Sequence, residues 1–125
     1  MSDRKLVHVV DDDEEVCRST AFMLRSAGLE CTYWTSGTSF LEGADTASQG
    51  CVILDVRMSD YDGFAVQQVL GQRESLLQVI MVSGHGDRAM ARRAIEAGAL
   101  DFIEKPYDQS GLLLKVEQAL SRQAC

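Results

Sequence analysis

The sequence of 125 residues has little of what marks zinc-binding, exported or membrane-spanning proteins. Its four cysteines are scattered, without Cys-x-x-Cys or Cys/His spacing, which argues against a zinc site and indicates reduced, mostly buried thiols. No apolar run approaches about 18 residues and no cleavable signal pattern follows the start, so we expect no membrane association and a cytoplasmic location. Lys and Arg number 12 against 19 Asp and Glu, and the formal charge of -7 argues against direct binding of nucleic acid by this segment.

Apolar runs of two kinds alternate along the chain, whose length suits one domain over residues 1–125. Compact runs rich in β-formers predict strands, and runs with helical spacing predict helices that end at Gly28 and Gly98. Asp87 is expected to cap the fourth helix, and Ala94 and Ile95 to share its buried side. The expected strands are 6–10, 30–35, the run beginning at Cys51, 79–82 and 100–103; the expected helices are 14–27, 36–43, 63–72, 87–98 and 110–122.

Five strand–helix units in succession predict a parallel sheet with helices on both faces, because parallel strands need right-handed crossovers. We therefore expect an α/β fold, a flavodoxin-like (βα)5 three-layer sandwich with strand order 2-1-3-4-5. In that order the first and third strands flank the point where the direction of winding reverses, so Asp11, Asp12 and Asp55 meet in one crevice. Ser83 and Lys105 follow the fourth and fifth strands and join the same edge.

Asp55 emerges from the buried third strand, and we interpret it as a nucleophile that accepts a phosphoryl group. Carboxylates that converge on it repel one another unless a cation neutralises them. An all-oxygen site with room for water and phosphate favours Mg²⁺ over zinc or calcium as the resident ion, although Mn²⁺ or Ca²⁺ could substitute. Asp11, Asp12, Asp55 and the backbone carbonyl of Arg57 are the expected ligands. The alternative is that residues 11–15 form a solvated turn whose acids stabilise the start of a helix.

Lys105 precedes Pro106, the only proline in the chain. A cis bond there would turn the backbone sharply and aim the Lys105 ammonium at the crevice, to pair with Asp55 at rest and with a phosphoryl oxygen afterwards. Ser83 leaves the fourth strand next to Gly84, so its hydroxyl can reach the site while the glycine leaves space for a phosphodonor. The alternatives are an exposed lysine before a helix and an ordinary loop serine.

Four segments together give the chain a family resemblance over its whole length. They are the acidic turn 10–13 (Val-Asp-Asp-Asp), the strand end 54–58 (Leu-Asp-Val-Arg-Met), Ser83 after an apolar strand, and 101–106 (Asp-Phe-Ile-Glu-Lys-Pro). In this order they resemble a response-regulator receiver domain of the CheY-like superfamily. The wording of 83–87 (Ser-Gly-His-Gly-Asp) and of 97–106 resembles receivers of the FixJ type in particular.

The resemblance implies a two-component signalling domain that catalyses only its own phosphorylation and dephosphorylation. Asp55 would take its phosphoryl group from a sensor histidine kinase or a phosphotransfer protein, with Mg²⁺ at Asp11 and Asp12 and with Ser83 and Lys105 on the phosphoryl oxygens. An aromatic at the position of Phe102 would change rotamer and switch the surface of the fourth helix, fifth strand and fifth helix. That surface would control a partner or output domain, or support a phosphorylation-dependent homodimer through the fourth helix and fifth strand. FixJ-type receivers often precede a DNA-binding domain that regulates transcription.

Two positions depart from the family pattern. Ser59 stands where family members commonly have proline, so the loop after Asp55 is expected to be more mobile. Ser83 stands where threonine is as usual, which keeps the hydrogen bond and loses a methyl group that restricts rotation. We expect looser switching as a result.

Other classes of function fit the residues less well. A phosphatase or dehalogenase-like hydrolase needs an acid two residues after its aspartate nucleophile, and Arg57 cannot act as one. A flavodoxin-like cofactor binder needs a phosphate-cradling loop where this chain has five acids. A receiver-fold interaction module that signals without phosphorylation is the remaining alternative. Phe102 could also be a plain strand aromatic, His8 is expected to be structural, and His85 lies near the crevice without an assigned role.

Overall fold

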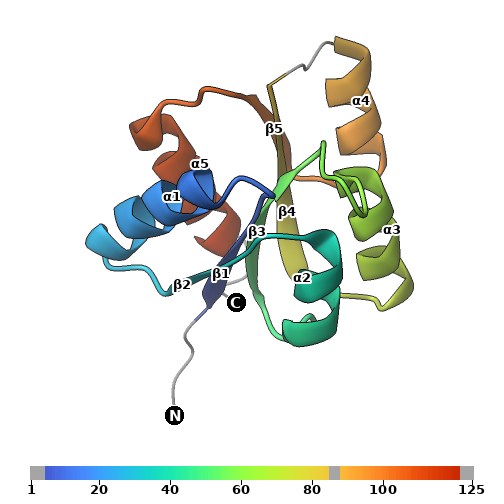
Figure 1. Ribbon diagram of the computed structural model, residues 1–125, viewed down its shortest axis with the longest axis horizontal. Helices are drawn as coiled ribbons and strands as arrows, with labels where there is room; N and C mark the ends of the chain where they lie inside the picture. Colours follow the sequence, from blue (N-terminus) through green and yellow to red (C-terminus); the bar gives the residue numbers. More distant parts are fainter. Residues whose placement is uncertain (1–4, 85–87, 122–125) are drawn as a thin grey trace.

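The computed structural model describes residues 5–84 and 88–121, which form five strands and five helices in strict alternation (Figure 1). All strand pairs are parallel and the order in the sheet is β2-β1-β3-β4-β5, which confirms the predicted flavodoxin-like fold class. The elements are β1 Leu6–Val10, α1 Glu14–Ser26, β2 Cys31–Trp34, α2 Gly37–Gly43, β3 Gly50–Asp55, α3 Gly63–Gln72, β4 Leu77–Ser83, α4 Arg88–Glu96, β5 Asp101–Glu104 and α5 Gln109–Ser121.

Helix starts and stops follow the local chemistry of the chain. The carboxylate of Asp13 accepts hydrogen bonds from the backbone of the first turn of α1, and Asp62 does the same for α3. Ser36 caps α2 through its hydroxyl. Gly28 and Gly98 follow α1 and α4 with φ of 91° and 107°, a left-handed conformation that glycine adopts at little cost. Asp87, the cap expected for α4, lies outside the described residues.

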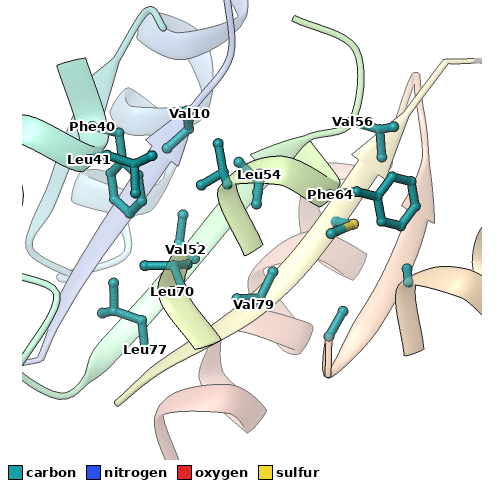
Figure 2. Packing of buried hydrophobic residues seen from close by; sticks show 14 residues of the cluster. Val10, Phe40, Leu41, Val52, Leu54, Val56, Phe64, Leu70, Leu77 and Val79 are labelled. Atoms are coloured by element: carbon teal, nitrogen blue, oxygen red, sulfur yellow. The ribbon is translucent and has the colours of Figure 1, made fainter. Parts of the chain in front are cut away.

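The sheet is covered on both faces by packed helices. Side chains alternate along each strand, so Val52 and Leu54 face α2, α3 and α4, where they pack with residues such as Phe40 (Figure 2). Cys51 and Ile53 face α1 and α5 and belong to a second core that includes Leu24, Leu112 and Val116. We call these the α3-side core and the α1-side core. Figure 1 shows α1 and α5 together on one side of the sheet, with α2, α3 and α4 on the other.

Two expectations about element limits and faces were wrong. β4 begins at Leu77 and includes Ser83, because it pairs with β3 from Gly50 onward and with β5 up to Glu104. Ser83 therefore lies in the strand and not in the loop after it. Ala94 is the buried residue of α4, whereas Ile95 is 49% exposed. Contrary to the expectation, Ile95 therefore does not share the buried side of the helix.

The first described residue, Lys5, contacts the end of α5 at the edge of the sheet where the strands begin. Lys5 Nζ donates a hydrogen bond of 2.7 Å to the carbonyl oxygen of Leu120 near the end of α5. The carboxyl ends of the strands lie at the opposite edge, where the acidic residues gather. Among the helices of the described segments, none has the length and apolar character needed to cross a bilayer.

Candidate functional site

Three carboxylates meet where β1 and β3 end. Asp11 and Asp12 follow β1, and Asp55 is the last residue of β3; the two strands pair as neighbours, with Val10 opposite Leu54. One carboxylate oxygen from each of the three acids lies within 4.8 Å of the others. Asp11 is 2% exposed and Asp55 is 5% exposed, whereas Asp12 is exposed. We call these three residues the acidic cluster, and the structure brings them together as the strand order predicts.

Burial makes the negative charge of Asp55 costly. Loss of solvent, followed by repulsion from Asp11, raises the pKa of Asp55 from 3.8 to about 6, against the attraction of Lys105. A carboxylate in this position gains from any cation that approaches it, because the added charge offsets both causes of the shift. A cation near the acidic cluster would therefore lower the cost of this charge.

Lys105 provides a positive charge beside the acidic cluster. Its Nζ lies 2.6 Å from Asp11 Oδ2 and 3.4 Å from Asp55 Oδ1, so the expected pairing with Asp55 is present but Asp11 is the closer partner. Burial lowers the pKa of Lys105, yet its bonds to the two acids outweigh that effect and the pKa is raised above its ordinary value. The bond between Lys105 and Pro106 is cis, as predicted. The alternative of an exposed lysine does not hold, because the side chain is only 22% exposed.

Backbone contacts fix the acids in place. The backbone N–H of Asp13 donates to Asp11 Oδ1 at 2.9 Å, and the thiol of Cys17 donates to the carbonyl oxygen of Asp11 at 3.2 Å. Gly63 brings the start of α3 against the end of β3, because its N–H donates to the carbonyl of Val56 at 2.7 Å. A Cβ at this glycine would lie 2.7 Å from the carbonyl oxygen of Asp55, so only glycine permits this approach.

The donor set of the acidic cluster suits a hard cation. The carboxylate oxygens of Asp11 and Asp12, in the loop after β1, and of Asp55, at the end of β3, leave part of a coordination sphere to water or phosphate, as Mg²⁺ prefers. Arg57 is exposed and follows Asp55 by two residues, and the part played by its backbone carbonyl stays a prediction. Asp13 serves as the cap of α1, as the alternative for the turn at 11–15 expects, and metal binding by Asp11 and Asp12 stays a prediction.

Ser83 and Phe102 lie on the neighbouring strands β4 and β5, with Ser83 at the carboxyl end of β4 and Phe102 two positions further from that edge. Ser83 is fully buried, and its carbonyl oxygen accepts a hydrogen bond of 2.9 Å from the backbone N–H of Lys105. Phe102 pairs with Met81 across the strands and is partly buried against the α3-side core. His85, the histidine expected near the crevice, lies outside the described residues. His8 is 2% exposed and its Nδ1 accepts a hydrogen bond of 3.1 Å from Trp34 Nε1, which fits the structural role expected for it.

Sequence reasoning missed three features around the site. The carboxylate of Asp60, in the loop after Asp55, accepts hydrogen bonds from the backbone of Gly37 and Thr38 at the start of α2. That loop is thus tied to α2, and the mobility expected from Ser59 stays a prediction. A cavity of about 530 Å³ opens beside Asp12; Arg93 lies in its wall, with its guanidinium 3.8 Å from the centre of the Phe64 ring. The third feature joins Thr20 to Tyr107 by a hydrogen bond of 2.7 Å.

A parallel sheet of this order with three acids and a lysine at its carboxyl edge defines a class of signalling protein. The family described as response regulator receiver domain matches residues 7–117, so the chain belongs to that family and is a receiver domain of a two-component response regulator.

Among curated proteins, the chain is 41% identical to the transcriptional regulatory protein FixJ of Azorhizobium caulinodans over 118 residues, which cover 94% of this chain and 56% of that protein. It is 40% identical to the response regulator protein TmoT of Ectopseudomonas mendocina over 121 residues, which cover 96% of this chain and 55% of TmoT. The chain thus spans about half the length of these relatives.

Solved structures agree with this assignment. The crystal structure of FixJ-N is 36% identical, with a TM-score of 0.88, and the match covers 100% of this chain and 99% of that one. The response regulator StyR is also 36% identical, with a TM-score of 0.89, over 97% of this chain and 61% of StyR. The predicted resemblance to FixJ-type receivers is confirmed.

Proposed function

We propose that Asp55 accepts a phosphoryl group from a phosphohistidine of a sensor histidine kinase or a phosphotransfer protein. The observation that carries the proposal is the arrangement of the acidic cluster around a single lysine, with Nζ of Lys105 at 2.6 Å from Asp11 and 3.4 Å from Asp55. This geometry supports the roles of Asp55 as nucleophile, of the acidic cluster as cation site and of Lys105 as fixed positive charge at one edge of the sheet.

The transfer is an in-line displacement at phosphorus. An oxygen of the Asp55 carboxylate forms a bond to phosphorus while the P–N bond of the phosphohistidine breaks, and the electron pair of that bond stays on the imidazole nitrogen. The product is an acyl phosphate on Asp55. Mg²⁺, held by Asp11, Asp12, Asp55 and the carbonyl of Arg57, would supply positive charge to the phosphoryl oxygens.

Lys105 and Ser83 act on the phosphoryl group after attack. Lys105 is near enough to Asp55 to pair with a phosphoryl oxygen there, where a compact ammonium offsets negative charge. Ser83 is buried at the end of β4 beside the backbone of Lys105, and its hydroxyl would donate to a second phosphoryl oxygen. Both groups stabilise charge, and neither needs to gain or lose a proton.

The signal would leave through the face formed by α4, β5 and α5. Phe102 is partly buried on β5, two residues after Leu100 and one strand away from Ser83, so a shift of Ser83 toward the phosphoryl group can alter its packing. We infer that residues 1–125 act as one receiver domain in the cytoplasm. A FixJ-like output domain that regulates transcription, or a homodimer through α4 and β5, would respond to that face.

Phosphorylation of the intact protein by a small phosphodonor tests the proposal. With Mg²⁺ and acetyl phosphate, the mass of the parent should increase by one phosphoryl group, and the masses of Asp55→Ala and Asp55→Asn should not. Asp62→Asn is a matched control. Asp62 lies in the loop that connects the end of β3 to α3, and Asn caps a helix as well as Asp does. A parent that stays unmodified, while another receiver is phosphorylated in parallel, would leave the receiver fold acting as an interaction module without phosphorylation.

A further inference from the structure

A hydrogen bond joins α1 to the segment between β5 and α5. Thr20 Oγ1 and Tyr107 Oη are 2.7 Å apart, across 87 positions of sequence. Thr20 is 3% exposed, and Tyr107 is partly buried against the α1-side core. In Figure 1 the segment from β5 to α5 passes to the side of the sheet that α1 occupies. Two polar groups are thus paired in a largely apolar setting, where breaking the pair would leave a buried hydroxyl without its partner.

The pair lies near Lys105 and Asp11, which are two of the charged residues of the site. Tyr107 follows Lys105 by two residues, and Thr20 lies one helical turn after Cys17, whose thiol donates to the backbone of Asp11. The buried face of α1 therefore contacts both the strand end that carries Asp11 and the segment that carries Lys105. The ion pair between Lys105 and Asp11 spans the gap between these two attachments.

Lys105 is held from both sides by this arrangement. On one side its backbone N–H donates to the carbonyl oxygen of Ser83, which fixes it to the end of β4. On the other side the hydroxyl of Tyr107 fixes the chain to α1. A lysine side chain has a long stem with several rotatable bonds. The position of its ammonium is therefore better defined when the backbone is fixed on both sides of Lys105.

We propose that Thr20 and Tyr107 are positioning residues for phosphoryl transfer to Asp55. Their hydrogen bond sets the distance of the Lys105 ammonium from Asp55, and with it the stabilisation of the phosphoryl oxygens as they gain charge. The inference rests on the proposed function, because it concerns the rate at which Asp55 is phosphorylated. Neither residue touches the phosphoryl group, so each acts through Lys105.

Removal of each hydroxyl tests the pair with little loss of packing. In Thr20→Val and Tyr107→Phe the side-chain shape is nearly kept, and the maximal rate of phosphorylation by phosphoramidate with Mg²⁺ should fall roughly three- to tenfold. The donor concentration at half-maximal rate should stay within about twofold, because the contact acts on charge that develops during transfer. The double variant should be no slower than either single variant, because both changes remove the same bond.

Thr20→Ser keeps a hydroxyl at this position and should restore most of the rate. Tyr33→Phe is the matched control, because the Tyr33 hydroxyl also bonds α1, at Glu14, but in an exposed place away from Lys105. Its rate should equal that of the parent. Urea unfolding of every variant separates a change of rate from a loss of folded protein.

Three results would overturn the inference. They are an unchanged rate in both single variants, effects that multiply in the double variant, or a rate in Thr20→Ser as low as in Thr20→Val. Each is read against a parent that is itself phosphorylated. If the parent does not react, the proposed function has failed, and the inference falls with it.

Discussion

Asp55 carries a charge that the fold makes costly to hold. Its pKa is about 6 in the folded protein against 3.8 for an ordinary aspartate, so its contribution to stability is greatest below about pH 3.8 and is lost as pH rises through 6. If Asp55 accepts the phosphoryl group as proposed, its burial beside Asp11 serves that reaction at the expense of the stability of the folded state.

Asp55→Asn should therefore stabilise the protein in the absence of metal ion. Near neutral pH and above, we expect the free energy of unfolding to rise by about 1–3 kcal/mol, since the variant removes a repelled buried charge and keeps the side-chain size. The gain should shrink toward about pH 5. Urea unfolding with a chelator present measures both values. A gain that is the same at both pH values would contradict the assigned cause.

His8 gives the opposite dependence on pH. Burial lowers its pKa from 6.5 to about 4, with a smaller opposing effect of Asp45, so the folded protein holds it neutral while the unfolded chain binds a proton below about pH 6.5. The stability from neutral His8 is complete above about pH 6.5 and is lost as pH falls toward 4. The loss should be about 2 kcal/mol between neutral pH and pH 5.

His8→Gln isolates this contribution. Glutamine does not titrate and offers a carbonyl oxygen to the Trp34 indole, the group that bonds His8. The difference in unfolding free energy between parent and variant should change by about 2 kcal/mol between neutral pH and pH 5. The contributions of the other titratable groups are the same in both proteins and cancel in this difference. Fluorescence of Trp34, the only tryptophan, reports unfolding. A difference that does not vary with pH would show that His8 is protonated in both states or in neither.

At the scale of the elements, the start of α3 decides how closely a helix can approach Asp55. Gly63→Ala places a Cβ 2.7 Å from the carbonyl oxygen of Asp55 and 3.0 Å from Val56 Cα, and neither backbone atom can move aside easily. We expect a loss of roughly 2–3 kcal/mol in unfolding free energy, with slower phosphorylation. Chemical unfolding together with the phosphorylation rate checks both effects.

Gly71→Ala on the same helix is the matched control. A Cβ there meets nothing within 4 Å, so the better helix propensity of alanine should raise stability by about 0.5–1 kcal/mol. Equal losses at both positions would mean that the helix tolerates no side chain there, and that the contact with Asp55 is not the cause.

The sequence was sufficient to predict every element and its order, because each strand and helix has its own hydrophobic period and most have a cap or glycine at an end. The exact ends of the strands and the buried sides of the helices were predicted less accurately. The extra residues of β4 depend on pairing with Gly50 and Glu104 in neighbouring strands, which no local pattern contains. The exposure of Ile95 depends on how α4 lies against the sheet, and helical spacing alone gives no such orientation.

At the scale of the whole molecule, the acidic cluster and Lys105 could be predicted because strand order alone brings strand ends together. The bond between Thr20 and Tyr107 could not, since it joins a helix to a loop across 87 positions and neither residue carries a charge that marks it. The closer pairing of Lys105 with Asp11 than with Asp55 also needed coordinates, because both acids lie at the same strand ends.

The oligomeric state of the protein tests whether the face formed by α4, β5 and α5 responds to phosphorylation. We expect phosphorylated protein to elute as a homodimer in size-exclusion chromatography with light scattering, and unphosphorylated protein as a monomer. Ile95→Glu should keep the phosphorylated protein monomeric, because Ile95 is an exposed apolar residue of α4 that would enter an interface through α4 and β5.

Phe22→Glu is the control, since Phe22 is a 74% exposed apolar residue of α1, on the other side of the sheet. It should dimerise like the parent. A phosphorylated parent that remains monomeric would exclude the homodimer and leave a separate partner or an attached domain to respond to phosphorylation.

The contact between Lys5 and Leu120 has a practical consequence for protein engineering. A short linker could connect residues 121 and 5 at the edge of the sheet farthest from Asp55, and the chain could be opened instead in the surface segment between α2 and β3. Such a circular permutant would keep all five strands and the acidic cluster. Its new ends would lie at the amino ends of the strands, where Thr46 bonds Arg73 and Ser75, and would allow a pair of fluorescent proteins to be attached there to follow phosphorylation in living cells.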